Sequence, residues 1–101
     1  MKAEIRHMVV FNLMHPEGSE EEKEFLEDSV RILGSIPFAS DFMLCREVSP
    51  KNGFDYGLSF DFASEEDYEK YNNDPRHVEY VNERWLKEVT DFMEIDLKWS
   101  Q

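Results

Sequence analysis

The sequence has little of three features that would place it in a specialised class of protein. A single cysteine, Cys45, leaves no partner for an intrachain disulfide. Only 11 lysines and arginines stand against 23 acidic residues, so the formal net charge is −12. This charge argues against binding to a nucleic-acid backbone or to an anionic membrane surface. No apolar run is long enough to span a bilayer, and none resembles a signal peptide, which predicts a cytoplasmic protein.

Large aromatic side chains are plentiful for so short a chain. Eight phenylalanines, four tyrosines and two tryptophans occur among 101 residues. A chain of this length has room for one domain, residues 1–101, with one hydrophobic core. We therefore expect several aromatic rings to share a core, an interface or a pocket.

Alternating and helical patterns of apolar residues predict seven elements. Strands are expected at residues 4–14, 41–48, 54–62 and 91–99, and helices at residues 20–34, 65–72 and 75–89. Ser19 and Ser64 have the spacing of helix N-caps, and Gly34 marks a helix end. Because Pro75 follows the second helix directly, the two helical stretches form one interrupted unit. The order β-α-β-β-α-β predicts an α+β, ferredoxin-like protomer with an antiparallel four-stranded sheet.

Helices cover only one face of such a sheet. The other face is expected to carry Met8, Val10, Met43, Cys45 and Phe92. An uncovered apolar face favours pairing with another protein surface. The sequence therefore predicts a homodimer in which two sheets face each other as a dimeric α/β barrel.

His77 is the strongest candidate for chemistry. If Pro75 opens a helix, His77 lies in its first turn, where the positive helix end favours a neutral ring that can act as a general base. Tyr71 could donate a hydrogen bond to a carbonyl or enolate oxygen. The structural alternatives are a histidine that packs at a helix start and a tyrosine that belongs to the core.

The remaining polar candidates are weaker. His7 lies among apolar residues on the first strand, where a lone histidine is usually a hydrogen-bonded core group. His7, His15 and His77 have no metal-ligand spacing, so neither a metal site nor a cofactor is expected. The aromatic face of residues 54–62, which includes Phe60, is expected to belong mainly to the core and secondarily to a ligand pocket.

Four segments of the chain carry a recognisable pattern: residues 5–11, residues 35–37, residues 55–64 and residues 71–78, which read Tyr-Asn-Asn-Asp-Pro-Arg-His-Val. They resemble the first strand, the helix exit, the third strand and the Tyr-x-x-His-Pro-x-His-Val segment of the stress-responsive α/β barrel (Dabb) domain family, with Asp74 in place of the first histidine. The resemblance covers nearly the whole chain. The resemblance implies a ferredoxin-like protomer, a homodimer and a pocket between sheet and helices.

The resemblance also implies roles for particular residues. One plant member of the family closes a polyketide ring by aldol condensation without a cofactor, and its acid/base pair corresponds to His77 and Tyr71. The resemblance implies that His7, Phe25 and Leu26 line the pocket, and we expect Val9, Phe11, Phe60 and Trp85 to complete its lining. Asp74 does not occupy a catalytic position of that motif.

Three functions remain open at this point. The first is a stress-related or uncharacterised Dabb protein that binds a small apolar ligand. The second is a cyclase-like lyase in which His77 takes a proton next to a carbonyl group. The third is a quinol-type monooxygenase, which only the shared fold supports.

Overall fold

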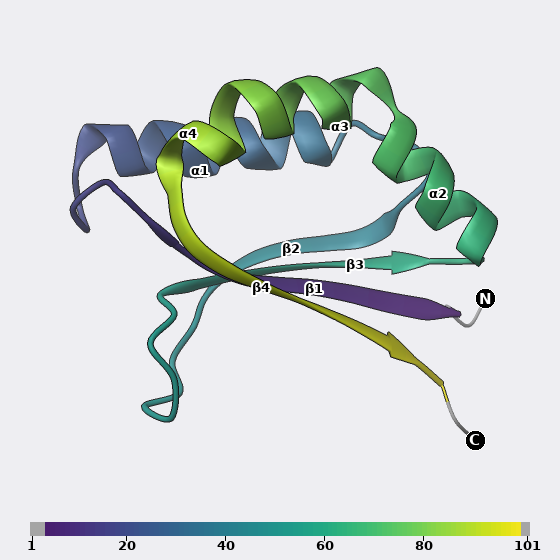
Figure 1. The fold of residues 1–101 in the computed structure, drawn as a ribbon, viewed down its shortest axis with the longest axis horizontal. Coiled ribbons are helices and arrows are strands. Elements are labelled where there is room, and N and C mark those ends of the chain that lie inside the picture. Colours follow the sequence, from purple (N-terminus) through teal and green to yellow (C-terminus); the bar gives the residue numbers. More distant parts are fainter. Residues whose placement is uncertain (1–3, 100–101) are drawn as a thin grey trace.

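A four-stranded sheet with helices on one side makes up the protein (Figure 1). The computed structural model describes residues 4–99. Its elements are β1 (Ile5–Leu13), α1 (Glu20–Leu33), β2 (Ser40–Arg46), β3 (Tyr56–Phe62), α2 (Glu65–Asn73), α3 (Pro75–Tyr80), the π-helical turn η1 (Val81–Trp85), α4 (Leu86–Glu88) and β4 (Val89–Lys98). The predicted α+β, ferredoxin-like class is confirmed.

All strand pairs in the sheet are antiparallel, and the strand order is β2-β3-β1-β4. Residues that are paired on neighbouring strands point to the same face of the sheet, so the register shows which side chains face the helices and which face away. Phe11 lies between Tyr56 of β3 and Phe92 of β4, and its ring packs on Phe25 of α1, so these residues are on the side that the helices cover. Phe92 is therefore not on the bare face, and that part of the prediction is wrong. Its ring packs edge-on against Trp85 in the helical layer, with centroids 5.6 Å apart.

The bare face instead carries the intervening residues of β1 and β4. Met8 is paired with Ile95, Val10 with Met93 and Arg6 with Leu97. Met93 and Leu97 are about half exposed, at 49% and 51%. No helix of the described chain covers this side in Figure 1. The apolar residues of this surface, which we call the bare face, are Met8, Val10, Met43, Met93, Ile95 and Leu97.

The helices α1 and α2 begin at the predicted residues and end within one residue of the predicted bounds. The hydroxyls of Ser19 and Ser64 accept hydrogen bonds from the backbone N–H of Glu22 and Asp67, each at 3.1 Å. Gly34 follows α1, but its φ of −68° is right-handed rather than left-handed. Glycine is required there because a Cβ would lie 2.6 Å from the carbonyl oxygen of Val30.

The helical stretch over residues 75–89 is not the continuous helix that the pattern predicts. It runs as α3, the π-helical turn η1 and the short α4, and Val89 already belongs to β4. A π-helical turn accommodates one extra residue, and such turns are frequent at functional sites. Here η1 ends at Trp85, whose buried ring packs on Phe11 with centroids 4.8 Å apart. The turn thus sets which residues of this stretch face the sheet.

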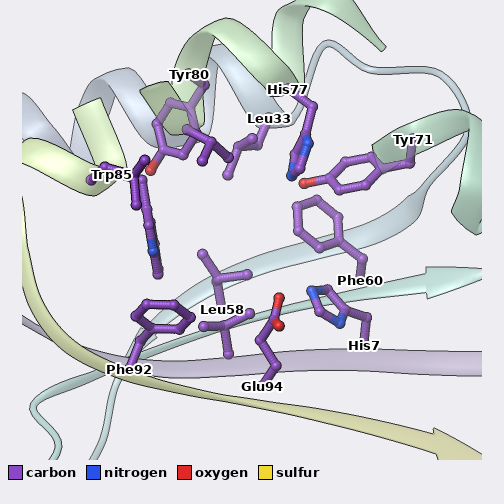
Figure 2. Close-up of a pocket in the computed structure, with 13 residues that line it drawn as sticks. His7, Leu33, Leu58, Phe60, Tyr71, His77, Tyr80, Trp85, Phe92 and Glu94 are labelled. Atoms are coloured by element: carbon purple, nitrogen blue, oxygen red, sulfur yellow. The ribbon is translucent and has the colours of Figure 1, made fainter. Parts of the chain in front are cut away.

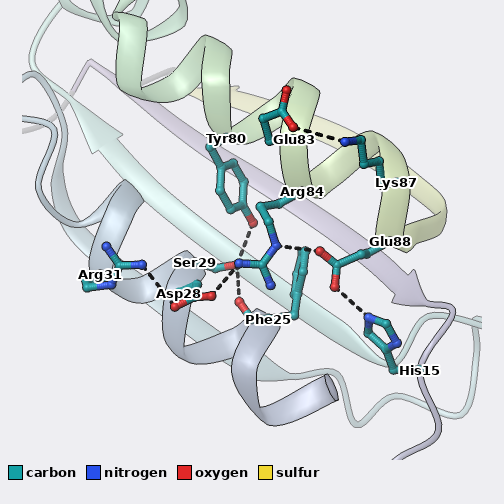
Figure 3. A network of polar contacts seen from close by, with 10 residues as sticks. All are labelled: His15, Phe25, Asp28, Ser29, Arg31, Tyr80, Glu83, Arg84, Lys87 and Glu88. Atoms are coloured by element: carbon teal, nitrogen blue, oxygen red, sulfur yellow. Dashed lines mark hydrogen bonds and ion pairs between the residues drawn. The ribbon is translucent and has the colours of Figure 1, made fainter. Parts of the chain in front are cut away.

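A polar network joins α1 to this stretch (Figure 3). Arg84 donates a hydrogen bond to Glu88 at 2.6 Å and another to Asp28 of α1. His15 in the loop before α1 lies 2.6 Å from the second carboxylate oxygen of Glu88. Burial would raise the pKa of Glu88, but the hydrogen bonds from Arg84 and His15 outweigh it and lower that pKa. The network therefore holds two carboxylates ionised around one guanidinium.

We expect Arg84→Met to lower the free energy of unfolding by about 2 kcal/mol, because it leaves two partly buried carboxylates without their cation. Solvent reaches part of Arg84, so the cost stays below that of a fully buried ion pair. Lys87→Met removes an exposed ion pair with Glu83 on the same stretch and should cost less than about 0.5 kcal/mol. Urea denaturation measures both values, and equal losses would contradict a central role for Arg84.

Within residues 4–99, no helix has the length and apolar character needed to cross a membrane.

Candidate functional site

A pocket of about 240 Å³ lies between the sheet and the helices, and its polar side chains gather at one end (Figure 2). That end is formed by His7 of β1, Tyr71 of α2, His77 of α3 and Glu94 of β4. The rest of the wall is largely apolar and includes Val9, Leu33, Leu58, Phe60, Trp85 and Phe92. The volume is below the range for drug-sized ligands, so the pocket suits a small molecule with one polar end.

His77 and Tyr71 lie next to each other at the polar end. Their ring centroids are 4.6 Å apart, and Figure 2 shows the Tyr71 hydroxyl and the His77 ring directed toward the same space above Phe60. Nδ1 of His77 donates a hydrogen bond to the carbonyl oxygen of Asn72 at 3.1 Å. Since Nδ1 carries the hydrogen, Nε2 of the neutral ring is left as an acceptor.

Burial shifts both groups in the direction that acid/base chemistry needs. Desolvation lowers the pKa of His77, against an opposing effect of the Asn72 carbonyl, so the neutral ring dominates at neutral pH. Desolvation also raises the pKa of Tyr71, so its hydroxyl stays protonated. The sequence argument assigned the shift of His77 to the helix start, whereas burial is its main cause. The pair therefore consists of one proton acceptor and one hydrogen-bond donor.

Two hydrogen-bond partners, one on the neighbouring strand β4 and one on α2, hold His7 in place. Its Nδ1 lies 2.6 Å from Asp96 of β4 and 2.8 Å from the Tyr68 hydroxyl of α2. That hydroxyl in turn donates to both oxygens of Asp96, each at 3.0 Å. Because an ionised carboxylate only accepts, Nδ1 carries a hydrogen and the other ring nitrogen is left toward the pocket. The buried His7 is thus fixed in one orientation.

Asp74 has a structural role. Its carboxylate accepts a hydrogen bond from the backbone N–H of Arg76 at 2.9 Å and so caps α3. The Arg76 guanidinium donates to the same carboxylate and holds its pKa at about 2. This N-cap gives a physical reason for aspartate at the position where the family segment has histidine.

The structure brings most, but not all, of the expected pocket residues together. His7, Val9, Phe60, Tyr71, His77 and Trp85 all line the pocket. Phe11 and Phe25 do not, because both rings are completely buried against Trp85. Leu26 does not either, because it faces a separate groove beside Val30 and Leu44. The pocket therefore ends at Trp85, and α1 contributes Leu33 rather than Phe25 and Leu26.

Four residues that form or support the polar end of the pocket were not found from the sequence: Tyr68, Asn72, Glu94 and Asp96. A signal for two of them existed in the last strand, where apolar residues at 93, 95 and 97 alternate with polar residues at 94 and 96. Since the apolar set lies on the bare face, Glu94 and Asp96 must face the helices. Tyr68 and Asn72 carried no comparable signal.

No metal-ligand cluster of three His, Cys, Asp or Glu side chains is present within residues 4–99. Asp96, next to the pocket, is paired with His7.

The fold and the pocket define a small ferredoxin-like protein with a histidine and a tyrosine side by side in a pocket between its sheet and its helices. Comparison with known families narrows this class further. The Stress Responsive A/B Barrel Domain (Dabb) matches residues 5–99, and the chain belongs to that family.

Solved structures agree with this assignment. A Dabb family protein with a ferredoxin-like fold from Mesorhizobium loti is 42% identical, with a TM-score of 0.96 and coverage of 99% of this chain and 100% of that chain. A dimeric ferredoxin-like protein of unknown function from Thermobifida fusca is 13% identical, with a TM-score of 0.78 and coverage of 96% and 92%. A hydroxynitrile lyase from Passiflora edulis is 14% identical, with a TM-score of 0.81 and coverage of 96% and 94%. The last two show the fold alone. No curated protein matches the sequence significantly.

Proposed function

We propose that the pocket binds a small, mostly apolar carbonyl compound and that His77 removes a proton from the carbon next to the carbonyl group. The C–H electrons move into an enolate, the proton goes to Nε2 of His77, and Tyr71 donates a hydrogen bond to the enolate oxygen. The step uses protein side chains alone. The observation that carries the proposal is the adjacent pair of a neutral His77 and a protonated Tyr71 in a largely apolar pocket.

The pocket also supports binding as a function in its own right. Its wall is mostly apolar, and the hydroxyl of Tyr80 is already engaged with Ser29 at 2.6 Å, so the polar contacts offered to a ligand come from one end. A protein that binds such a ligand without altering it is the alternative. The monooxygenase hypothesis gains no comparable support, because it rests on the shared fold alone.

Hydrogen–deuterium exchange at an activated carbon separates catalysis from binding. Phenylacetone in D₂O has exchangeable protons next to its carbonyl group, and proton NMR follows their loss. We expect the protein to speed this exchange well above an equal concentration of free imidazole, because the pocket places the base and the hydrogen-bond donor together. Exchange no faster than with imidazole would refute catalysis. A shift of the Trp85 indole resonance without exchange would favour simple binding.

We further propose that the protein forms a homodimer through the bare face. Met43, Met93 and Leu97 are each exposed by about half, on a surface that also includes Met8 and Val10. A contiguous apolar surface on a sheet favours burial against another copy. The Thermobifida fusca protein of the same fold is described as dimeric, which supports a dimer here. The substitution Met93→Glu on the bare face tests this interface.

A further inference from the structure

Glu94 is the one carboxylate that lines the pocket among the described residues. It lies opposite Val9 in the β1–β4 register, on the helix-covered side of the sheet. Figure 2 shows its carboxylate turned into the pocket, between the apolar end and His7. Any molecule that reaches His77 and Tyr71 therefore meets the carboxylate of Glu94.

The fold makes no visible use of this carboxylate. Within residues 4–99, Glu94 has neither an ion pair nor a hydrogen bond from its side chain, although the neighbouring Asp96 is tied to His7 and Tyr68. Glu94 is exposed as well as lining the pocket, so its carboxylate can be reached from solvent. Its charge acts on His77 and opposes the lowering of that pKa by burial. The carboxylate is free to interact with a ligand.

We infer that Glu94 is the specificity-determining residue of the pocket, which selects ligands carrying an N–H or O–H donor and rejects carboxylates. An ionised carboxylate has only acceptor oxygens, so it favours an ammonium or hydroxyl group and repels an anion. The inference rests on the proposed function and names its substrate class: an amino- or hydroxy-substituted carbonyl compound with an apolar body. Repulsion of carboxylates contributes to this specificity together with attraction of the donor groups.

Two probes of equal shape test the inference by binding alone. Benzylamine and benzoate each carry one polar group on a phenyl ring, with opposite charges at neutral pH, and titration is followed at the Trp85 indole N–H by NMR. We expect the parent protein to bind benzylamine at least about tenfold more tightly than benzoate. Glu94→Gln should bring this ratio toward one, and Glu94→Lys should reverse it. Because Glu94 is exposed, both variants are expected to fold, which circular dichroism checks.

The acidic surface as a whole also attracts cations, so a matched control is needed. Glu24 is an exposed residue on α1 outside the pocket, and Glu24→Gln removes the same charge. It should leave the ratio unchanged if the selection is local. The inference is overturned if Glu94→Gln keeps the parent ratio, if Glu24→Gln changes the ratio as much as Glu94→Gln does, or if neither probe moves the Trp85 resonance. Since the readout is a ratio of binding constants, it can succeed or fail independently of the exchange of phenylacetone.

Discussion

His77→Gln should slow the exchange of phenylacetone by about 10²-fold or more relative to the parent protein. A positioned general base contributes on the order of 10²–10⁴ to proton abstraction, and glutamine keeps the polar shape without the basic nitrogen. Tyr71→Phe removes only the hydroxyl that would face the enolate oxygen, and a loss of about 10²-fold is expected there as well. The two losses should not add when combined, because the base and the donor act in one step.

His15→Gln is the matched control for this experiment. His15 is a third histidine, it bonds to Glu88 in the polar network, and it lies outside the pocket. Its replacement should leave the exchange rate unchanged, while thermal unfolding reports any change in stability. A parent-like rate in His77→Gln would remove His77 from the chemistry. A parent-like rate in Tyr71→Phe would refute the oxyanion role alone.

The pH dependence of the same rate tests the protonation states. The ordinary histidine value is 6.5, and burial lowers the pKa of His77 below it. The basic form therefore dominates above pH 6.5, so the rate should be level there and fall only at lower pH. Burial raises the pKa of Tyr71, so no decline is expected on the mildly alkaline side. A rate that still climbs between pH 7 and pH 8 would show that the essential base is not a histidine with a lowered pKa.

Local chemistry made most of the fold predictable. The alternation of Phe54, Tyr56, Leu58, Phe60 and Phe62 predicts β3, and all but the first belong to the strand. Before Tyr56 the regular ladder gives way to mixed contacts, in which the N–H of Asp55 donates to the side chain of Asn12 at 2.8 Å and to the carbonyl oxygen of Phe11 at 3.3 Å. Such boundaries depend on a partner from another element, and no pattern within residues 54–62 contains it.

The error at Phe92 has a definite physical cause. Phe92 and Met93 are adjacent apolar residues, so either could begin the inward-facing set of the last strand. A shift by one residue moves every side chain of a strand to the other face of the sheet. Ile95 and Leu97 share a face with Met93 and not with Phe92, and the pairing with β1 places that apolar set on the bare face, so Phe92 falls on the helix-covered side.

The candidate site was predictable only where one segment carries it. Tyr71 and His77 are six residues apart, so their proximity follows from two consecutive helices. The contact of His7 with Asp96 joins residues separated by 89 positions, and it exists only because β1 and β4 are neighbours in one register. Glu94 enters the pocket for the same reason. Sequence patterns that are read segment by segment contain no information on such pairs.

Met93→Glu should convert the protein from a dimer into a monomer of 12.1 kDa, half the mass expected for the parent. Met93 lies on the bare face, opposite Val10 in the β1–β4 register. In a sheet-to-sheet dimer each copy would place a carboxylate without a partner in an apolar contact. Sedimentation equilibrium measures the mass directly. Since Met93 is 49% exposed in the isolated chain, the substitution spares the core, and circular dichroism should stay unchanged.

Val30→Glu provides a closely matched comparison for this substitution. Val30 is 48% exposed and lies on α1, in the helical layer on the other side of the sheet. The substitution Val30→Glu adds the same negative charge to the same protein, so a general effect of added charge on association would appear in both variants. We expect Val30→Glu to keep the parent mass. A parent of 12.1 kDa would refute the dimer itself, whereas a dimer that survives Met93→Glu would place its interface away from the bare face.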